Sequence, residues 1–185
     1  MTLFEYLAIA FSLVFSSSAM RLVGGLPHAF DAQRRYWVHL GFVGIQLVAT
    51  LGVFWAFWSY RDLEWNVGRF ALALTGPSLI YLSACTLVPE NPESVPSWRD
   101  YYYGVRRRYF GSCIAWALLA GVATTALVQM PWSHPARISQ GTALVAGVVG
   151  CATASPRVHA GIVLVLAGVA IAVLVLLAAP GSLAA

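Results

Sequence analysis

The chain has 185 residues, of which 59% are hydrophobic and 10% are charged, whereas an ordinary globular domain is about 25% charged. Its charges cluster and leave stretches of about 20 residues without one, the length of helix that crosses a bilayer core, so the composition excludes a soluble globular protein. The net charge of +4 comes from eleven arginines against seven acids, on a chain with no soluble basic face for nucleic acid, so we expect membrane lipids and not nucleic acid as partners.

Six apolar segments predict an all-α fold: a polytopic membrane protein with six transmembrane helices, short loops and a single transmembrane helical domain over residues 1–185. The expected spans are about 3–24, 36–59, 67–88, 103–130, 138–154 and 158–179. The first is expected to stay as a helix and not to be cleaved as a signal peptide, because the residues before "SSSAM" are not basic and include Glu5. We expect it to end at the glycines and proline of "RLVGGLP" (21–27).

The arginines are divided unequally between the loops that six spans place on alternate sides of the membrane. One side receives eight of them: Arg21, Arg34, Arg35, Arg99, Arg106, Arg107, Arg108 and Arg157. The other side receives three: Arg61, Arg69 and Arg137. Because arginine in short loops is retained in the cytoplasm, the richer side is predicted to face inward in a bacterial-type inner membrane, with both termini outside.

Three successive arginines follow three tyrosines in "RDYYYGVRRRYF" (99–110). Successive helical residues point about 100° apart, so Arg106, Arg107 and Arg108 form a collar around the fourth helix and not a single binding stripe. With Tyr103, they are predicted to anchor this helix among the lipid headgroups. The alternative is a dedicated site for an anionic lipid or a phosphate-bearing solute.

Neutral polar residues inside the spans supply the leading functional hypothesis, because polar groups in hydrocarbon are costly. They are Ser12 and Ser16 in the first span, Gln46 and Thr50 in the second, and Thr75 and Ser78 in the third. If these faces converge, they line a neutral path, so we expect a passive channel or transporter for a small solute or ion. The alternative is hydrogen bonding between helices. No charge lies in the middle of a span, which argues against a proton relay.

Small residues recur every four positions in the fifth and sixth spans, a pattern that lets helix backbones approach closely. The runs are Ala143-Gly147-Cys151, Ala146-Gly150-Ala154 and Ala160-Leu164-Gly168-Ala172. They support a second hypothesis, in which the protein is a non-catalytic subunit or scaffold that forms a homo-oligomer or joins a larger membrane complex.

Histidines supply a third hypothesis, a haem-binding electron-transfer anchor. His39 and His159 each lie about one turn into a span from the arginine-rich side, where two facing imidazoles could ligate a b-type haem. No other cofactor and no metal site is expected, because Cys85, Cys113 and Cys151 lack CxxC spacing. Hydrolase and nucleotide-binding motifs such as GxSxG are missing from the sequence, which disfavours an enzyme.

Overall fold

The computed structural model describes residues 3–178, which form six α-helices and two short 3₁₀ helices. The α-helices are α1 (Leu3–Ala29), α2 (Trp37–Ala56), α3 (Val67–Leu87), α4 (Trp98–Val128), α5 (Ala136–Ala152) and α6 (Pro156–Ala178). The 3₁₀ helices are η1 (Phe57–Tyr60), which continues α2, and η2 (Pro92–Ser94), which lies in the loop before α4. The prediction of an all-α chain is confirmed.

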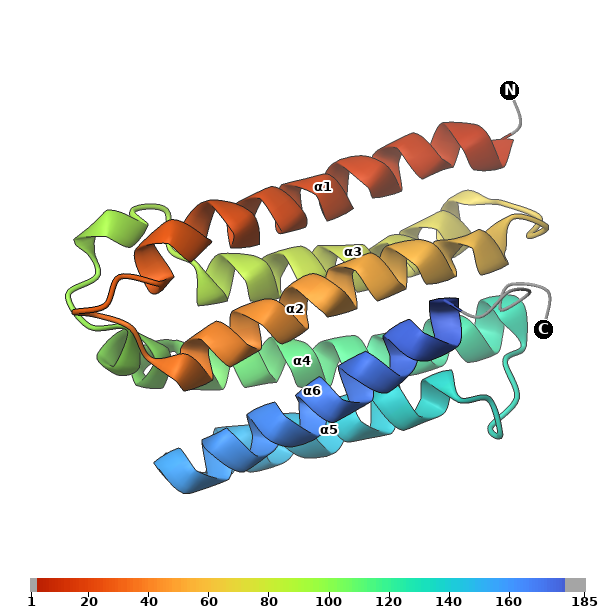
Figure 1. Ribbon diagram of the computed structural model, residues 1–185. Coiled ribbons are helices and arrows are strands. Elements are labelled where there is room, and N and C mark those ends of the chain that lie inside the picture. The colour runs from red at the N-terminus through yellow and green to blue at the C-terminus, as the bar shows by residue number, and fades with distance from the viewer. Residues whose placement is uncertain (1–2, 179–185) are drawn as a thin grey trace.

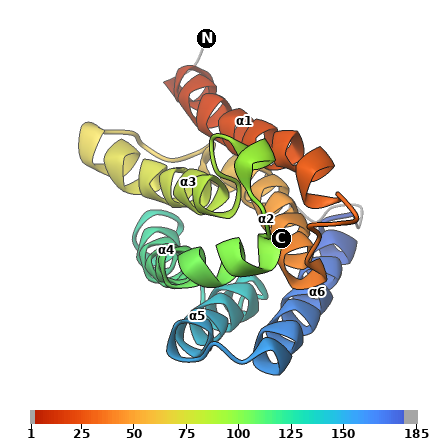
Figure 2. The same cartoon turned by 90° about the vertical axis from the view of Figure 1, so that its left-hand side faces the viewer.

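Consecutive helices run in opposite directions, so the loops gather at the two ends of an elongated bundle (Figure 1). α2 lies between α1 and α6 and also packs on α3, while α3, α4 and α5 follow one another along the other side (Figure 2). The first turns of α4 cross the end of the bundle before the helix turns into it (Figure 2). The start of α4 is thereby placed against the ends of its neighbours.

Five of these helices are long and apolar enough to cross a membrane: α1, α2 with η1, α3, α4 and α6. α5 has 17 residues, which span about 26 Å at a rise of about 1.5 Å per residue, slightly less than a hydrocarbon core of about 30 Å. The structure is therefore compatible with a multi-pass membrane protein. A sixth crossing, by α5, stays a prediction.

The eight arginines predicted for one side of the membrane belong to one end of the bundle, where α1 meets α2, α3 meets α4 and α5 meets α6 (Figure 1). This end is named the basic end. The acidic residues that belong to it are Asp31, Glu90, Glu93 and Asp100. The opposite end holds three arginines and three acidic residues, so the net charge of +4 is confined to the basic end.

α4 begins at Trp98, well before the position near 103 that apolarity predicts. Ser97 caps it, because its side-chain oxygen accepts a hydrogen bond from the backbone N–H of Asp100 at 3.3 Å. A serine followed three residues later by an acid, here "SWRD", is a known start signal for helices. Apolarity alone does not register this start, because the first two turns carry Arg99, Asp100 and three tyrosines.

α1 continues through "RLVGGLP" to Ala29, although the glycines and proline predict a stop there. Pro27 lies in the last turn, where the loss of one backbone donor is tolerated, and the helix ends two residues after it. Gly25 is needed for close packing, because a Cβ at this position would lie 2.5 Å from a methyl carbon of Val88. The glycine therefore lets α1 approach the end of α3.

Two main apolar clusters fill the bundle. The larger one draws buried side chains from all six helices and includes the rings of Phe42, Tyr102 and Phe110. The smaller one lies at the other end of α1, where Phe11 stacks on Phe57 of η1 with ring centroids 4.0 Å apart. Aromatic packing therefore joins α1 and α2 to their neighbours along most of their length.

Gly150 of α5 lies against the ring of Phe110 of α4, and a Cβ at this position would lie 2.5 Å from ring carbon Cδ2. Because Phe110 is 1% exposed, its ring has little room to move. We expect Gly150→Ala to lower the free energy of unfolding by about 1–3 kcal/mol, measured by thermal unfolding in detergent. Gly141→Ala, on the same helix but with open space around its Cβ position, should be neutral or slightly stabilising. Equal effects of the two changes would contradict this packing.

Candidate functional site at the basic end

Three carbonyls at the end of α3 each accept a hydrogen bond from a side chain of another helix. The bonds run from the Tyr101 hydroxyl to Thr86, from His39 Nε2 to Leu87 and from Arg21 Nε to Val88, each at 2.9 Å. The last carbonyls of a helix have no partner within that helix, and unpaired backbone groups are costly next to lipid. Side chains of α1, α2 and α4 therefore jointly close the end of α3.

His39 is fully buried against Trp98, with the two ring centroids 4.6 Å apart and the rings nearly parallel. Its Nε2–H donates to the Leu87 carbonyl, so Nδ1 carries no proton in the neutral ring. Nδ1 is buried and has no hydrogen-bond partner within residues 3–178. Trp98 donates its indole N–H to the carbonyl of His28, close to the end of α1, at 2.9 Å.

His159 closes the end of α5 in the same manner. Its Nε2–H donates to the carbonyl of Thr153 at 2.9 Å, and its Nδ1 accepts a hydrogen bond from the hydroxyl of Tyr102. Arg106 donates to the same Thr153 carbonyl at 3.2 Å, which puts a cation at the negative end of the α5 dipole. Together these bonds connect α4, α5 and α6.

The haem hypothesis requires the two histidines to face one another with free ring nitrogens. The structure does bring His39 and His159 to the same end of the bundle, but the ring of Tyr102 contacts both, with centroids 6.5 Å from His39 and 5.4 Å from His159. Both nitrogens of His159 are already hydrogen-bonded. A haem would have to break these bonds. Within the described residues, no group of three histidine, cysteine or acidic side chains could hold a metal ion.

The three successive arginines differ in their surroundings. Arg106 is half-buried against the end of α5, whereas Arg107 and Arg108 are exposed, so the predicted contact with lipid phosphate is open to the last two. Tyr103 shares a hydrogen bond with Tyr36 through the two hydroxyls, 3.1 Å apart. Burial, and secondly this bond, raise the pKa of Tyr36 above its usual value, so this phenol stays neutral.

Two of the six predicted lining residues lie together in the interior. Thr50 is buried and donates to the carbonyl of Gln46 at 2.8 Å, as serine and threonine often do within their own helix. The Gln46 carboxamide is also buried and joins three helices: it donates to the carbonyl of Ile80 and accepts from the hydroxyl of Tyr109, both at 3.4 Å. Gln46 thus has partners on α3 and α4.

The other four predicted lining residues form no hydrogen bond with Gln46 among the residues that the structure describes. Thr75 and Ser78 are half-buried and donate to carbonyls of their own helix, those of Leu72 and Leu74. On α1, Ser12 is half-buried and Ser16 is exposed on the surface of the bundle. The structure therefore brings two of the six together and leaves at least one of them outside the interior.

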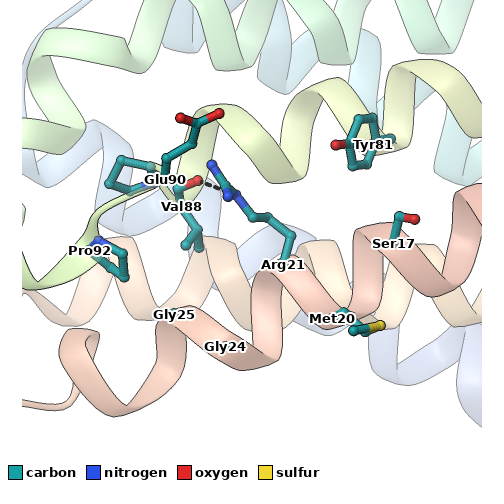
Figure 3. Close-up of a pocket in the computed structure, with 10 residues that line it drawn as sticks. Ser17, Met20, Arg21, Gly24, Gly25, Tyr81, Val88, Glu90 and Pro92 are labelled. Atoms are coloured by element: carbon teal, nitrogen blue, oxygen red, sulfur yellow. Dashed lines mark hydrogen bonds between the residues drawn. The ribbon is translucent and has the colours of Figure 1, made fainter.

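A groove of about 460 Å³ opens between α1 and the loop that follows α3 (Figure 3). Its charged lining residues are Arg21 and Glu90, and Ser17 and Tyr81 add hydroxyl groups. The other lining residues are small or apolar: Met20, Gly24, Gly25, Val88, Pro89 and Pro92. The sequence gives no motif for this groove, because it forms between segments that are far apart in the chain.

At the opposite end of the bundle, Arg137 of α5 holds the end of α4. Its guanidinium donates to the hydroxyls of Thr124 and Thr125, at 3.0 and 2.8 Å, and to the carbonyl of Met130, at 2.8 Å. It also lies over the ring of Trp132, 4.8 Å from the centroid. Arg137 therefore connects the end of α4 to the start of α5 through several side-chain contacts.

We expect Arg137→Ala to lower the free energy of unfolding by about 1–2 kcal/mol, because several charge-assisted hydrogen bonds are lost at a site that water can partly reach. Thermal unfolding in detergent measures the change. Arg61→Ala is the control: Arg61 is exposed beside Asp62, and a surface pair of this kind contributes little. If both variants unfold like the unaltered protein, Arg137 does not hold the turn.

Comparison with known proteins finds no relative: no family model, no curated protein and no solved structure matches this chain.

Proposed function

We propose that this protein is a non-catalytic subunit or scaffold of a membrane complex. One observation carries the proposal: the buried polar side chains form hydrogen bonds to other helices. These side chains are His39, Gln46, Tyr102 and His159. Bonds of this kind between helices hold a membrane bundle in one arrangement. A bundle tied in this way is suited to present a fixed outer surface to another protein.

A passive channel or transporter, the leading hypothesis from the sequence, needs its polar residues on one hydrated face. Gln46 instead bonds to α3 and α4, and Ser16 is exposed on the outside of α1. These positions favour the alternative of hydrogen bonding between helices. The channel is therefore our second candidate, and a flux measurement decides it.

α6 offers the surface for assembly. In α5 the predicted small-residue face is used within the protein, since Gly150 packs against Phe110. In α6, Gly161 and Gly168 are exposed and have nothing within 4 Å of their Cβ positions. Further exposed apolar residues at helical spacing extend this face: Leu164, Val165, Ala172 and Val175. Another transmembrane helix can approach closely at such glycines.

The assembly test is purification from native membranes in mild detergent, with the mass of the particle and the stoichiometry of its chains measured. We expect a defined complex, and we expect Gly168→Leu to reduce the share of the protein found in it. Gly44→Leu is the matched control, because Gly44 is also exposed with open space around it, but on α2. A monomer that conducts solutes or ions in proteoliposomes would overturn the proposal in favour of the channel.

We further propose that all six helices cross a bacterial-type inner membrane, with the basic end in the cytoplasm and both termini outside. The confinement of the net positive charge to one end supports this orientation. Single cysteines at the exposed positions Ser94 and Ser133, in a variant without the three native cysteines, test it. A membrane-impermeant thiol reagent should label position 133 in intact spheroplasts and leave 94 unlabelled, and the reverse pattern would contradict the orientation.

A further inference from the structure

The groove between α1 and α3 presents one positive and one negative side chain to the same opening. Arg21 reaches from α1 toward the loop after α3, where Glu90 lies (Figure 3). The Nε of Arg21 is occupied by the Val88 carbonyl, whereas its two terminal nitrogens make no hydrogen bond to residues 3–178. Glu90 is exposed, and the carboxylate forms no hydrogen bond with Arg21 in the groove. Both charges are therefore free to contact a ligand.

The groove lies at the depth expected for lipid headgroups. Arg21 bonds to Val88, the residue that follows the last residue of α3, so its guanidinium is level with the point where the chain leaves that apolar helix. Met20 is 74% exposed and Gly24 is also exposed, which leaves the groove open along the flank of α1. A lipid in the bilayer can reach the groove from the side, with its acyl chains along the apolar helix surface.

We propose that this groove binds the headgroup of a zwitterionic phospholipid with a primary ammonium group, of the phosphatidylethanolamine type. The phosphate accepts hydrogen bonds from the terminal nitrogens of Arg21, and the ammonium donates to the carboxylate of Glu90. An anionic lipid without the ammonium leaves Glu90 unpaired and repels it. A quaternary ammonium has no N–H to donate. The two charges therefore select one headgroup chemistry, and the site is distinct from the predicted lipid contacts of Arg107 and Arg108.

The test is native mass spectrometry of the purified protein in detergent, with phosphatidylethanolamine, phosphatidylglycerol and phosphatidylcholine of identical acyl chains supplied in equal amounts. We expect the unaltered protein to retain phosphatidylethanolamine about tenfold better than the other two, the ratio given by one well-placed charge-assisted hydrogen bond. Glu90→Gln should remove this preference while leaving phosphate binding, and Arg21→Gln should remove retention of all three lipids. Equal retention of the three lipids by the unaltered protein would overturn the proposal.

A second pair of variants keeps the test independent of folding, because Arg21 also caps α3 and its replacement changes more than the groove. Gly24→Leu fills the groove at an exposed position with nothing within 4 Å of its Cβ position, and should abolish lipid retention. Gly44→Leu, equally open on α2, should leave retention unchanged. Equal lipid retention by these two variants would show that the groove is not a phospholipid site. Full displacement of the lipid by inorganic phosphate would show the same. Neither outcome bears on the assembly proposal.

Discussion

Trp98→Ala is expected to lower the free energy of unfolding by about 3–5 kcal/mol, the range for truncation of a large buried aromatic side chain. The indole is 0% exposed, and it lies where the end of α1, the start of α2 and the start of α4 meet. It stacks on His39 and donates to the carbonyl of His28. Alanine leaves a cavity beside a buried imidazole and removes the shorter of the two hydrogen bonds to that carbonyl, which keeps only the backbone N–H of Asp31 at 3.4 Å.

Circular dichroism during thermal unfolding in detergent measures this loss without relying on tryptophan fluorescence. Trp98→Phe keeps a ring over His39 and loses the indole N–H, so it should cost less, about 1–2 kcal/mol. Trp37→Ala is the matched control, because Trp37 is 54% exposed and lies only two residues before His39. A loss for Trp98→Ala no greater than that for Trp37→Ala would show that the basic end is not built around this indole.

Apolarity predicted the bounds of the second and third helices best. The second and third spans, expected at 36–59 and 67–88, are found at 37–60 with η1 included and at 67–87. The predicted helix bounds differed from the structure for α1 and α4 near the basic end, where capping and packing determine where a helix begins or ends. Ser97 caps the start of α4 among charged residues and tyrosines. Gly25 does not end α1 but allows it to pack closely against Val88. A hydropathy pattern contains no information about either effect.

The sequence predicted some residues of the candidate site but not the groups to which they bond. The sequence identified Gln46 as a polar group at depth, and His39 and His159 as possible haem ligands near the end of a span; all three are buried. Their partners are mostly carbonyls, such as those of Leu87 and Thr153, and backbone atoms leave no mark in the pattern of side chains. Spacing defines a face of a helix but not the neighbour that this face meets, which is why the serines of α1 could not be placed.

His159→Ala is expected to lower the free energy of unfolding by about 2–5 kcal/mol, as a large-to-small change at a fully buried position. It leaves the hydroxyl of Tyr102 without its acceptor, and only Arg106 still donates a side-chain hydrogen bond to the Thr153 carbonyl. Tyr102→Phe keeps the ring but leaves Nδ1 of His159 without its hydrogen-bond donor, so it should lower the free energy of unfolding by about 1–3 kcal/mol. Both values come from thermal unfolding in detergent.

Because the two changes remove the same hydrogen bond, the double variant Tyr102→Phe with His159→Ala should lose less than the sum of the single losses, by about 1 kcal/mol or more. Once the imidazole is gone, the hydroxyl of Tyr102 has no buried partner to lose, and a phenylalanine is then nearly as good. Tyr102→Phe combined with Arg137→Ala, at opposite ends of the bundle, should instead be additive within about 0.5 kcal/mol. Additivity in both pairs would mean that Tyr102 and His159 pack together without being coupled through their hydrogen bond.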